Sequence, residues 1–350
     1  MKLYICSNCQ NPLYFENSLC LQCKREVGFD AHKLVMITSV ESMDEFTKPT
    51  GKKDVYRYCE NKTNGTCNWL LPIKDTHKFC TACDLNRTIP NLTTPGNLEK
   101  WSRIEIAKHR LVYSLLRLNL PVKSKWSDEE QGLIFDFMAD VSTEEKIMTG
   151  HSNGTITLNI NEADEVERVR HKLDLGERYR TLLGHFRHEV GHYYWDILVK
   201  DDSSIDEFRK LFGDERSDYT EALKAYYAGG LPPDWSAKFI SPYASSHPWE
   251  DWAETWAHYL HMMDTLETAY AFGIDINPQK VKEPDMQAEI NRDPYTIKDF
   301  NRIVKLWLPL TFAVNSLNRS MGHQDFYPFI ISEPVIAKLK FIHELCYTKR

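Results

Sequence analysis

The cysteines near the N-terminus constrain the fold of this chain more than any other feature. Eight of the nine cysteines lie within the first 83 residues. Two CxxC pairs separated by ten residues can bring four thiolates around one zinc ion, namely those of Cys6, Cys9, Cys20 and Cys23. Four thiolates leave no open position for water. The pattern therefore predicts a structural zinc site in a small fold that is held together by metal.

A second group of cysteines follows with a looser pattern. It combines one CxxC pair with two more distant residues, and its members are Cys59, Cys67, Cys80 and Cys83. We predict that this group binds a second zinc ion, with His32 and His77 as possible substitute ligands, so that the segment holds one or two structural zinc ions. The segment can serve as a stapled fold alone or as a recognition module for a protein partner or nucleic acid, and both readings stay open. Cys346 stands alone in an amphipathic pattern, which favours a packing role.

Charge and hydropathy narrow the class of partner and the compartment. The net charge of −7 argues against nucleic acid or an anionic membrane as the main partner. Residues 1–90 carry 12 Lys and Arg against 10 Asp and Glu, far from a clustered basic face. The N-terminal residues show no secretory signal, and no stretch reaches the roughly 18 apolar residues of a membrane span. We expect a cytoplasmic protein whose cysteines are metal ligands or free thiols.

A change of pattern near residue 90 predicts two domains. The segment "TIPNLTTPGNLEKW" is rich in turn residues and reads as a connection between a zinc-ribbon domain over 1–90 and a second domain over 97–350. The second domain has one alternating strand pattern at 154–160. Its helical patterns are at 99–119, 177–199, 203–212, 215–228, 248–270, 294–318 and 332–347. The predicted fold class is α+β, with a mostly helical second domain that contains a small sheet.

The stretch "LLGHFRHEVGHYYWDILV" contains an HExxH motif, His188-Glu189-Val190-Gly191-His192. Residues four apart lie on one helix face, so His188 and His192 can bind one zinc ion. Glu189 then acts as the general base toward a water whose pKa the zinc lowers to about 7. Gly191 leaves space for a neighbouring element. The alternative is that both histidines are core residues and bind no metal. This alternative explains less well why two histidines and a glutamate lie together on an apolar helix.

A third protein ligand is expected downstream. The metzincin extension is excluded, because Trp195 and Leu198 occupy its glycine and histidine positions. In "SPYASSHPWEDWAETWAHYLH", Glu250 and Glu254 lie four apart on a predicted helix. We favour Glu250 as the zinc ligand and Glu254 as the group that orients a ligand histidine. The rival ligands are His247, His258 and His261.

Tyr243 precedes this helix in a loop rich in Pro and Ser. It is a candidate hydrogen-bond donor to the oxyanion that develops during hydrolysis. The alternative is an aromatic side chain that packs on the helix, and the sequence leaves the two readings balanced.

Several segments together make the chain resemble a family. They include "LYFENSLCLQC", "CNWLLPI", "ITLNINEAD", "YRTLLGHFRHEVGHYYWD", "FGDERSDY", "HPWEDWAETWAHYLHMMDTLETA" and "YPFIISEPVIAKL". The chain resembles bacterial zinc-binding metallopeptidases that join an N-terminal zinc ribbon to a gluzincin-like peptidase domain. The resemblance implies a zincin-like fold, with His188, His192 and Glu250 as zinc ligands and Glu189 as the base. It names no substrate.

Three further segments receive hypotheses of their own. In zincin-like folds an edge strand before the catalytic helix holds extended substrate, and residues 154–160 have that place in the order of the chain. The charge-dense segment 161–172 is predicted to be a solvated helix face. "FGDERSDYTEAL" can line a cleft, but a structural role in ion pairs is favoured.

The leading hypothesis is a zinc-dependent hydrolase that acts on a peptide or protein substrate. An alternative is an adaptor in which the zinc ribbon recruits a protein partner and the metal domain is regulated or inactive. A third is a zinc hydrolase for a non-peptide amide. The presence of Glu189 argues against an inactive scaffold, because a site without catalysis has no need of a base.

Overall fold

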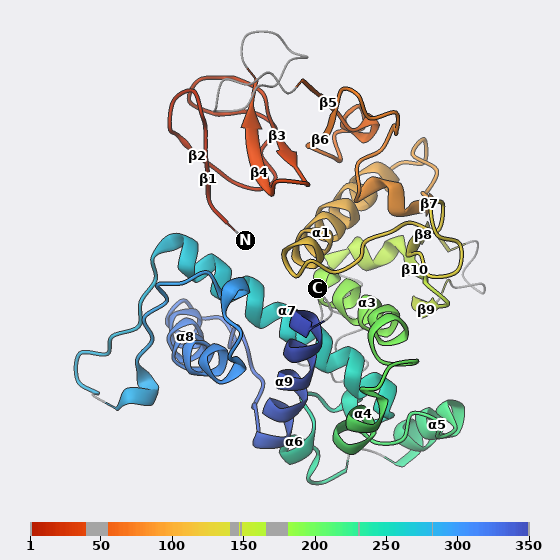
Figure 1. Cartoon of the computed structure of the whole chain (residues 1–350), viewed down its shortest axis with the longest axis vertical. Helices are drawn as coiled ribbons and strands as arrows, with labels where there is room; N and C mark the ends of the chain where they lie inside the picture. The colour runs from red at the N-terminus through yellow and green to blue at the C-terminus, as the bar shows by residue number, and fades with distance from the viewer. Residues whose placement is uncertain are drawn as a thin grey trace. The chain divides into compact units, whose positions relative to one another are not determined.

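The computed structural model describes residues 2–39, 55–140, 147, 149–165, 181–229, 232–281 and 283–348. Its contacts divide the chain into two compact units, Met1–Leu175 and Gly176–Arg350. Figure 1 labels the helices and strands of both units. Each unit is described by itself.

The cysteine-rich part of the first unit forms two small sheets. The first is an antiparallel pair, β1 (Tyr4–Ile5) and β2 (Pro12–Leu13). The second has the order β4-β3-β6-β5, with β3 and β6 parallel and the other pairs antiparallel. Its strands are β3 (Val27–Asp30), β4 (Val35–Thr38), β5 (Tyr56–Tyr58) and β6 (Trp69–Pro72).

A further sheet of the first unit has the order β7-β8-β10-β9. Its strands are β7 (Asn86–Thr88), β8 (Ile134–Met138), β9 (Gly150–Ser152) and β10 (Thr155–Asn159). β10 pairs in parallel with β8 and antiparallel with β9, so both of its sides are occupied. The strand predicted at 154–160 is therefore present, but the hypothesis that it is an edge strand open to substrate is wrong.

Helix α1 (Asn97–Arg117) joins these parts of the first unit (Figure 1). The Tyr113 ring packs 5.3 Å from the Phe15 ring of the cysteine-rich part. On another face, Lys108 Nζ lies 5.5 Å from the centre of the Phe137 ring in β8. Residues on both sides of the predicted boundary at 90–97 thus share one core. Helix α1 buries side chains against the cysteine-rich part on one face and against the β7-β8-β10-β9 sheet on another.

The second unit is helical over most of its described residues. Its helices are α3 (Leu182–Leu198), α4 (Ile205–Phe212), α5 (Tyr219–Gly229), α6 (Trp235–Lys238), α7 (Pro248–Phe272), α8 (Phe300–Ser320) and α9 (Glu333–Thr348). Together with α1 they confirm the helical patterns and the α+β class. Residues 177–180 of the predicted helix, and 166–172 of the predicted charged helix face, lie outside the described residues.

Short 3-10 turns complete the two units. They are η1 (Glu60–Lys62), η2 (Cys83–Leu85), η3 (Ile160–Ala163), η4 (Tyr243–Ser245), η5 (Pro284–Met286) and η6 (Pro294–Thr296). Within the described residues, no helix is both long enough and apolar enough to span a membrane.

Helix α7 is the central element of the second unit and packs against α3, α4, α8 and α9. Its start is fixed locally: the His247 side chain accepts a hydrogen bond from the backbone N–H of Trp249, and Pro248 occupies the first turn. It ends at Gly273, whose φ of 64° is the left-handed conformation that favours glycine at a helix C-terminus.

Candidate metal centres

Helix α3 presents the two histidines of the HExxH motif to one side. Thr181 caps the helix by accepting a hydrogen bond from the backbone N–H of Gly184 at 2.9 Å. Phe186 and Val190 are buried and fix the inner face. The spacing of one turn then brings His188 Nε2 and His192 Nε2 within 3.2 Å of each other.

Helix α7 approaches α3 at Gly191. A Cβ at this position would lie only 3.0 Å from Ala253 Cα and 3.2 Å from Trp256 Cβ. The indole N–H of Trp252 donates a hydrogen bond to the Gly191 carbonyl at 2.8 Å. The predicted role of Gly191 is confirmed, because the absence of a side chain lets the two helices come this close.

This packing brings Glu250, in the first turn of α7, to the two imidazoles. Glu250 Oε2 lies 3.0 Å from His188 Nε2 and 3.5 Å from His192 Nε2. Oε2 is buried, and no donor among the described residues hydrogen-bonds to it. Burial alone would raise the pKa of Glu250, but the imidazoles outweigh it and hold the pKa well below its usual range.

Glu254 lies one turn further along α7 and binds the far side of the His188 ring. His188 Nδ1 is 2.7 Å from Glu254 Oε1, and Ser241 Oγ donates to Glu254 Oε2 at 2.6 Å. Burial would raise the pKa of Glu254, yet the contact with His188 lowers the pKa to about 2. A carboxylate at Nδ1 makes Nδ1 the donor, so Nε2, which faces Glu250, is the nitrogen available to a metal ion.

The donor set therefore fits a zinc ion. Two imidazole Nε2 lone pairs and one carboxylate oxygen converge within 4.8 Å of one another. Such a cluster of electron pairs in a buried place is unfavourable without a cation. Two histidines and one carboxylate form a frequent three-ligand set of catalytic zinc, in which a fourth position stays open.

Tyr219 is a residue of this site that sequence reasoning missed. Its hydroxyl, at the start of α5, donates to Glu250 Oε1 at 2.6 Å and leaves Oε2 toward the imidazoles. Burial and the nearby Glu250 carboxylate raise the pKa of Tyr219, so the hydroxyl keeps its proton. The segment "FGDERSDYTEAL", to which Tyr219 belongs, is predicted to have a structural role in ion pairs. That role is confirmed for the pair of Arg209 with Glu215, while Tyr219 itself reaches the metal ligand.

Tyr243 lies close to both His188 and Tyr219. The rings of Tyr243 and His188 are 6.0 Å apart between centroids, and burial raises the pKa of Tyr243. Glu189 is half-buried. No hydrogen bond or ion pair joins its side chain to another described residue.

The three rival histidines are engaged elsewhere. His247 caps α7 and contacts Ser217 Oγ at 3.0 Å. The ring of His258 contacts the Tyr327 hydroxyl at 2.7 Å, and His261 contacts the Arg187 guanidinium. These side chains support the helices around the site and do not join the donor set of His188.

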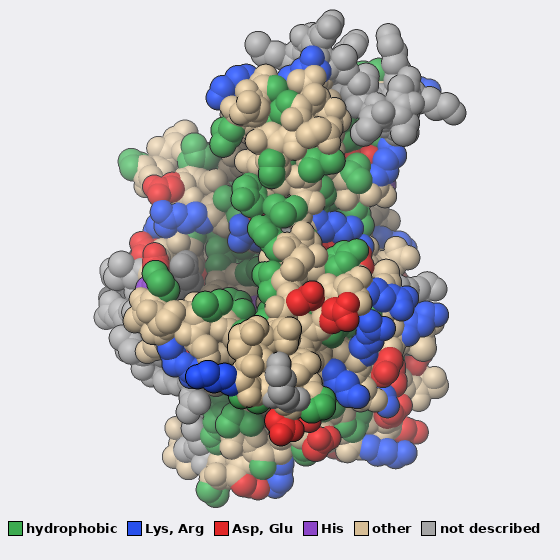
Figure 2. Space-filling model, turned by 90° about the vertical axis from the view of Figure 1, so that its left-hand side faces the viewer, with side chains coloured by type: hydrophobic (Ala, Val, Ile, Leu, Met, Phe, Trp, Pro, Cys, Tyr) green, Lys and Arg blue, Asp and Glu red, His purple; other side chains and the backbone are tan. Residues whose placement is uncertain are grey.

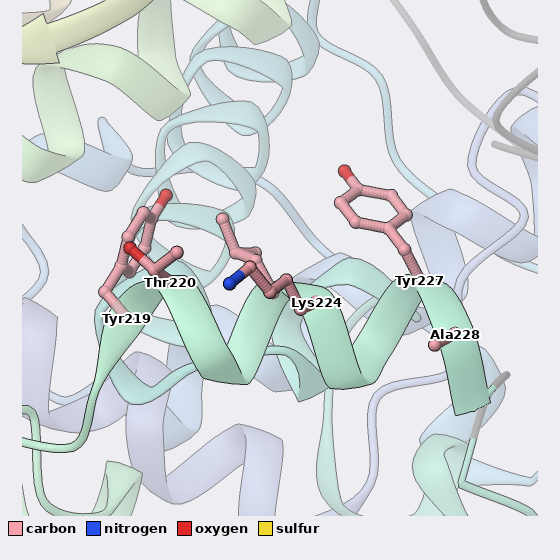
Figure 3. Close-up of a pocket in the computed structure, with 6 residues that line it drawn as sticks. Tyr219, Thr220, Lys224, Tyr227 and Ala228 are labelled. Atoms are coloured by element: carbon pink, nitrogen blue, oxygen red, sulfur yellow. The ribbon is translucent and has the colours of Figure 1, made fainter.

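A groove of about 620 Å³ runs along α5 beside this centre. Its lining residues are Tyr219, Thr220, Leu223, Lys224, Tyr227 and Ala228. Tyr219 and Tyr227 rise from the same side of the helix with Lys224 between them (Figure 3). Because Tyr219 belongs to both the groove and the zinc-ligand network, the groove begins at the candidate metal centre.

The cysteines gather in the two predicted quartets. In each, the four sulfur atoms lie within 4.8 Å of one another. In the first, the Sγ distances are 3.7 Å for Cys6 to Cys23 and 3.6 Å for Cys9 to Cys20. Neither possible substitute joins a quartet: His32 is exposed, and His77 pairs with Asp75. Cys346 is buried in α9.

The α+β fold and these donor sets define a zinc-binding protein with a cysteine-rich ribbon and a helical metal domain. The chain belongs to the family described as putative zinc-binding metallo-peptidase, whose model matches residues 97–345, and a zinc-ribbon domain model matches residues 3–94. It is 39% identical over 344 residues to uncharacterized proteins of Mycobacterium bovis and Mycobacterium tuberculosis, which covers 98% of this chain and 94% of each relative. No solved structure matches it significantly.

Proposed function

We propose that the protein is a gluzincin-like zinc metallopeptidase with His188, His192 and Glu250 as zinc ligands. The observation that carries the proposal is the position of Glu250 Oε2, buried and facing Nε2 of both histidines at 3.0 and 3.5 Å. Membership of the metallo-peptidase family supports the same reading.

The side chains around the site suit amide hydrolysis. A zinc ion held by the three ligands supplies Lewis acidity toward water and the scissile carbonyl. Glu189 then accepts the proton of the attacking water and delivers it to the leaving nitrogen as the C–N bond breaks. Tyr243 donates a hydrogen bond to the oxyanion that forms on the carbonyl oxygen.

The groove along α5 is the surface we assign to the substrate. It starts at Tyr219, whose hydroxyl contacts Glu250, and continues past Leu223 to Tyr227. α5 has no buried residue, so its aromatic and aliphatic side chains are available for contact. An extended peptide with a large apolar side chain matches this lining. β10 has no free edge, so we assign the binding of extended peptide to the groove and not to that strand.

We also infer a cytoplasmic location and a protein partner for the ribbon. Eight cysteines form two quartets in place of disulfides, which suits a reducing compartment. Apolar side chains of the ribbon are exposed, among them Ile5, Tyr14 and Leu21. Recovery of a disulfide-linked form from cells would contradict the compartment.

The decisive experiment is the Glu189→Gln variant. It keeps the shape of the side chain and all three metal ligands, so zinc content and melting temperature should equal those of the wild type. Turnover of a peptide library, followed by mass spectrometry, should fall about 10²- to 10⁴-fold because the general base is lost. Equal activity of the two proteins would exclude the mechanism, and no cleavage by either would favour the adaptor reading.

The two tyrosines are distinguished by the paired variants Tyr219→Phe and Tyr243→Phe. The first should weaken zinc binding about 10- to 100-fold, because Glu250 loses the donor that orients it. The second should keep its zinc and lose about 10²- to 10³-fold in kcat. Zinc titration with a fluorescent chelator and steady-state kinetics measure both. If Tyr243→Phe keeps its kcat, Tyr243 is only a packing residue.

A further inference from the structure

The second cysteine quartet is buried as a whole, unlike the first. Its four side chains are nearly inaccessible, with Cys67 the most exposed of them at 6%. Cys67 Sγ and Cys80 Sγ are 3.7 Å apart. The edge of a tetrahedron of thiolates about 2.3 Å from zinc is about 3.8 Å. The sulfur atoms therefore have the spacing that a zinc ion requires.

An imidazole from α1 lies against this quartet. His109 Nε2 is 3.3 Å from Cys67 Sγ and 3.7 Å from Cys83 Sγ. On the other side of the ring, Nδ1 is 2.6 Å from the Glu105 backbone carbonyl. A carbonyl oxygen only accepts, so Nδ1 carries a proton, and a ring that also donates through Nε2 is the doubly protonated, cationic imidazolium. The ring also packs 5.0 Å from Trp69, which fixes its plane.

The first quartet has a different environment. Cys9 and Cys23 are only half-buried, so water reaches their sulfur atoms. Its side-chain donors include the Thr38 hydroxyl, with Oγ1 at 3.6 Å from Cys6 Sγ, and the Asn8 amide, which hydrogen-bonds to Cys23. Zinc with four thiolates keeps a net negative charge, and burying that charge is costly without hydrogen-bond donors. The second quartet, which has no such access to water, has a greater need of donors from the protein.

We propose that His109 is a positioning residue of the zinc site predicted at the second quartet, where its imidazolium donates through Nε2 to the thiolates of Cys67 and Cys83. Two backbone N–H groups complete the set, from Trp69 to Cys67 Sγ and from Cys80 to Cys59 Sγ, each at 3.3 Å. Hydrogen bonds to sulfur lower the charge that each thiolate carries and tune the site.

The contact of His109 with the cysteines connects two parts of the chain that belong to different predicted domains. The four cysteines lie in the residues matched by the zinc-ribbon model, whereas His109 lies in those matched by the metallo-peptidase model. The second zinc therefore attaches the ribbon to α1 inside the first unit. The proposal is independent of the peptidase activity, since it concerns only residues of that unit.

The test uses the full chain loaded with Co²⁺ at saturation, in wild type, His109→Ala and His109→Gln. The catalytic site has no thiolate and the first quartet is the same in all three, so difference spectra report the second quartet. His109→Ala should bind as many ions as the wild type, with its thiolate-to-metal charge-transfer band at lower energy. In the zinc form, its release of metal to a thiol-modifying mercurial should be about 10-fold faster. His109→Gln, which keeps an N–H donor, should restore part of both changes.

His77→Ala is the matched control, because the His77 side chain is 74% exposed, pairs with Asp75 and belongs to neither quartet. It should leave spectrum and release rate unchanged. An unchanged spectrum and rate in His109→Ala would overturn the proposal. So would the loss of one ion at saturation, which would make His109 a ligand. If His109→Ala does not fold, the His109→Gln spectrum decides: identity with the wild type or a missing ion would overturn the proposal, and a smaller shift would support it.

Discussion

His188 shows how much one side chain in this site depends on its neighbours. Its Nε2 faces Glu250 at 3.0 Å and its Nδ1 faces Glu254 at 2.7 Å. Burial alone would lower the pKa of His188, but the two carboxylates raise it well above the usual value in the metal-free site. A zinc ion would displace the proton on Nε2. The motif predicts the ligand role, whereas the carboxylate that sets the tautomer comes from another helix.

Glu254→Gln tests this orienting role. The amide keeps the size of the side chain but removes the negative charge that holds the proton on His188 Nδ1. Zinc affinity should fall about 10- to 100-fold, measured by competition with a chelator. The control is Glu207→Gln, an exposed position in α4, which should bind zinc as the wild type does. Unchanged affinity in Glu254→Gln would mean that Glu254 has no part in ligand orientation.

Two further residues illustrate what spacing cannot reveal. Tyr219 lies 31 residues before Glu250 and His109 lies 42 residues after Cys67. Neither separation corresponds to a turn or a helix face. Tyr219 contacts its partner only because α5 begins beside the first turn of α7.

At the scale of elements, the contact of α3 with α7 creates the candidate active site. The helical periodicity of both segments is visible in the sequence, and so is the small residue between the two histidines. The sequence does not indicate which helix fills the space at Gly191, because apolar faces occur on every long helix of the second unit.

Gly191→Ala should therefore damage both stability and metal binding. The added Cβ would lie 3.0 Å from Ala253 Cα, and backbone cannot move aside as a flexible side chain can. We expect a loss of about 1–3 kcal/mol in the free energy of unfolding, measured by urea denaturation. Gly229→Ala at the end of α5 is the control, since no described residue lies within 4 Å of its added Cβ. Equal stability of the two variants would show that α3 and α7 tolerate a wider spacing.

The strand at 154–160 shows the limit of pattern reasoning for sheets. The alternation of buried Ile156 and Leu158 with half-buried residues predicts a strand with one covered face. An alternating pattern specifies which face is buried but not which strands lie alongside. The short strand β9, with the sequence Gly-His-Ser, carries no such pattern, and it occupies the edge of the sheet instead of β10.

At the scale of the whole molecule, metal and core stabilise different parts of the chain. The cysteine-rich strands are two to four residues long, so the two quartets supply much of what holds them. The second unit has a helical core around α7, which buries three tryptophans at 1% exposure or less: Trp252, Trp256 and Trp307. On the face drawn in Figure 2, acidic and basic side chains are interspersed.

Removal of zinc should therefore unfold the chain in part. Structural zinc contributes about 10–16 kcal/mol to small cysteine-rich folds, more than such segments gain from their cores. With excess chelator, hydrogen exchange measured by mass spectrometry should rise strongly in residues 2–39 and 55–88. Residues 181–229 and 232–272 should stay protected apart from the ends of α3 and α7 near the ligands. Equal loss of protection in both units would show that their stability does not differ in this way.

The sequence alone determined the class of metal site, because ligand chemistry is tied to short spacings. Two residues four apart on a helix share a face, and a CxxC turn brings two thiolates to one ion. The tertiary structure decided the rest: which of the candidate third ligands reaches the two histidines, the tyrosine that holds Glu250, the imidazole against the second quartet and the order of the strands. These features join residues far apart in the chain, and only the packing of whole helices and sheets sets their distances.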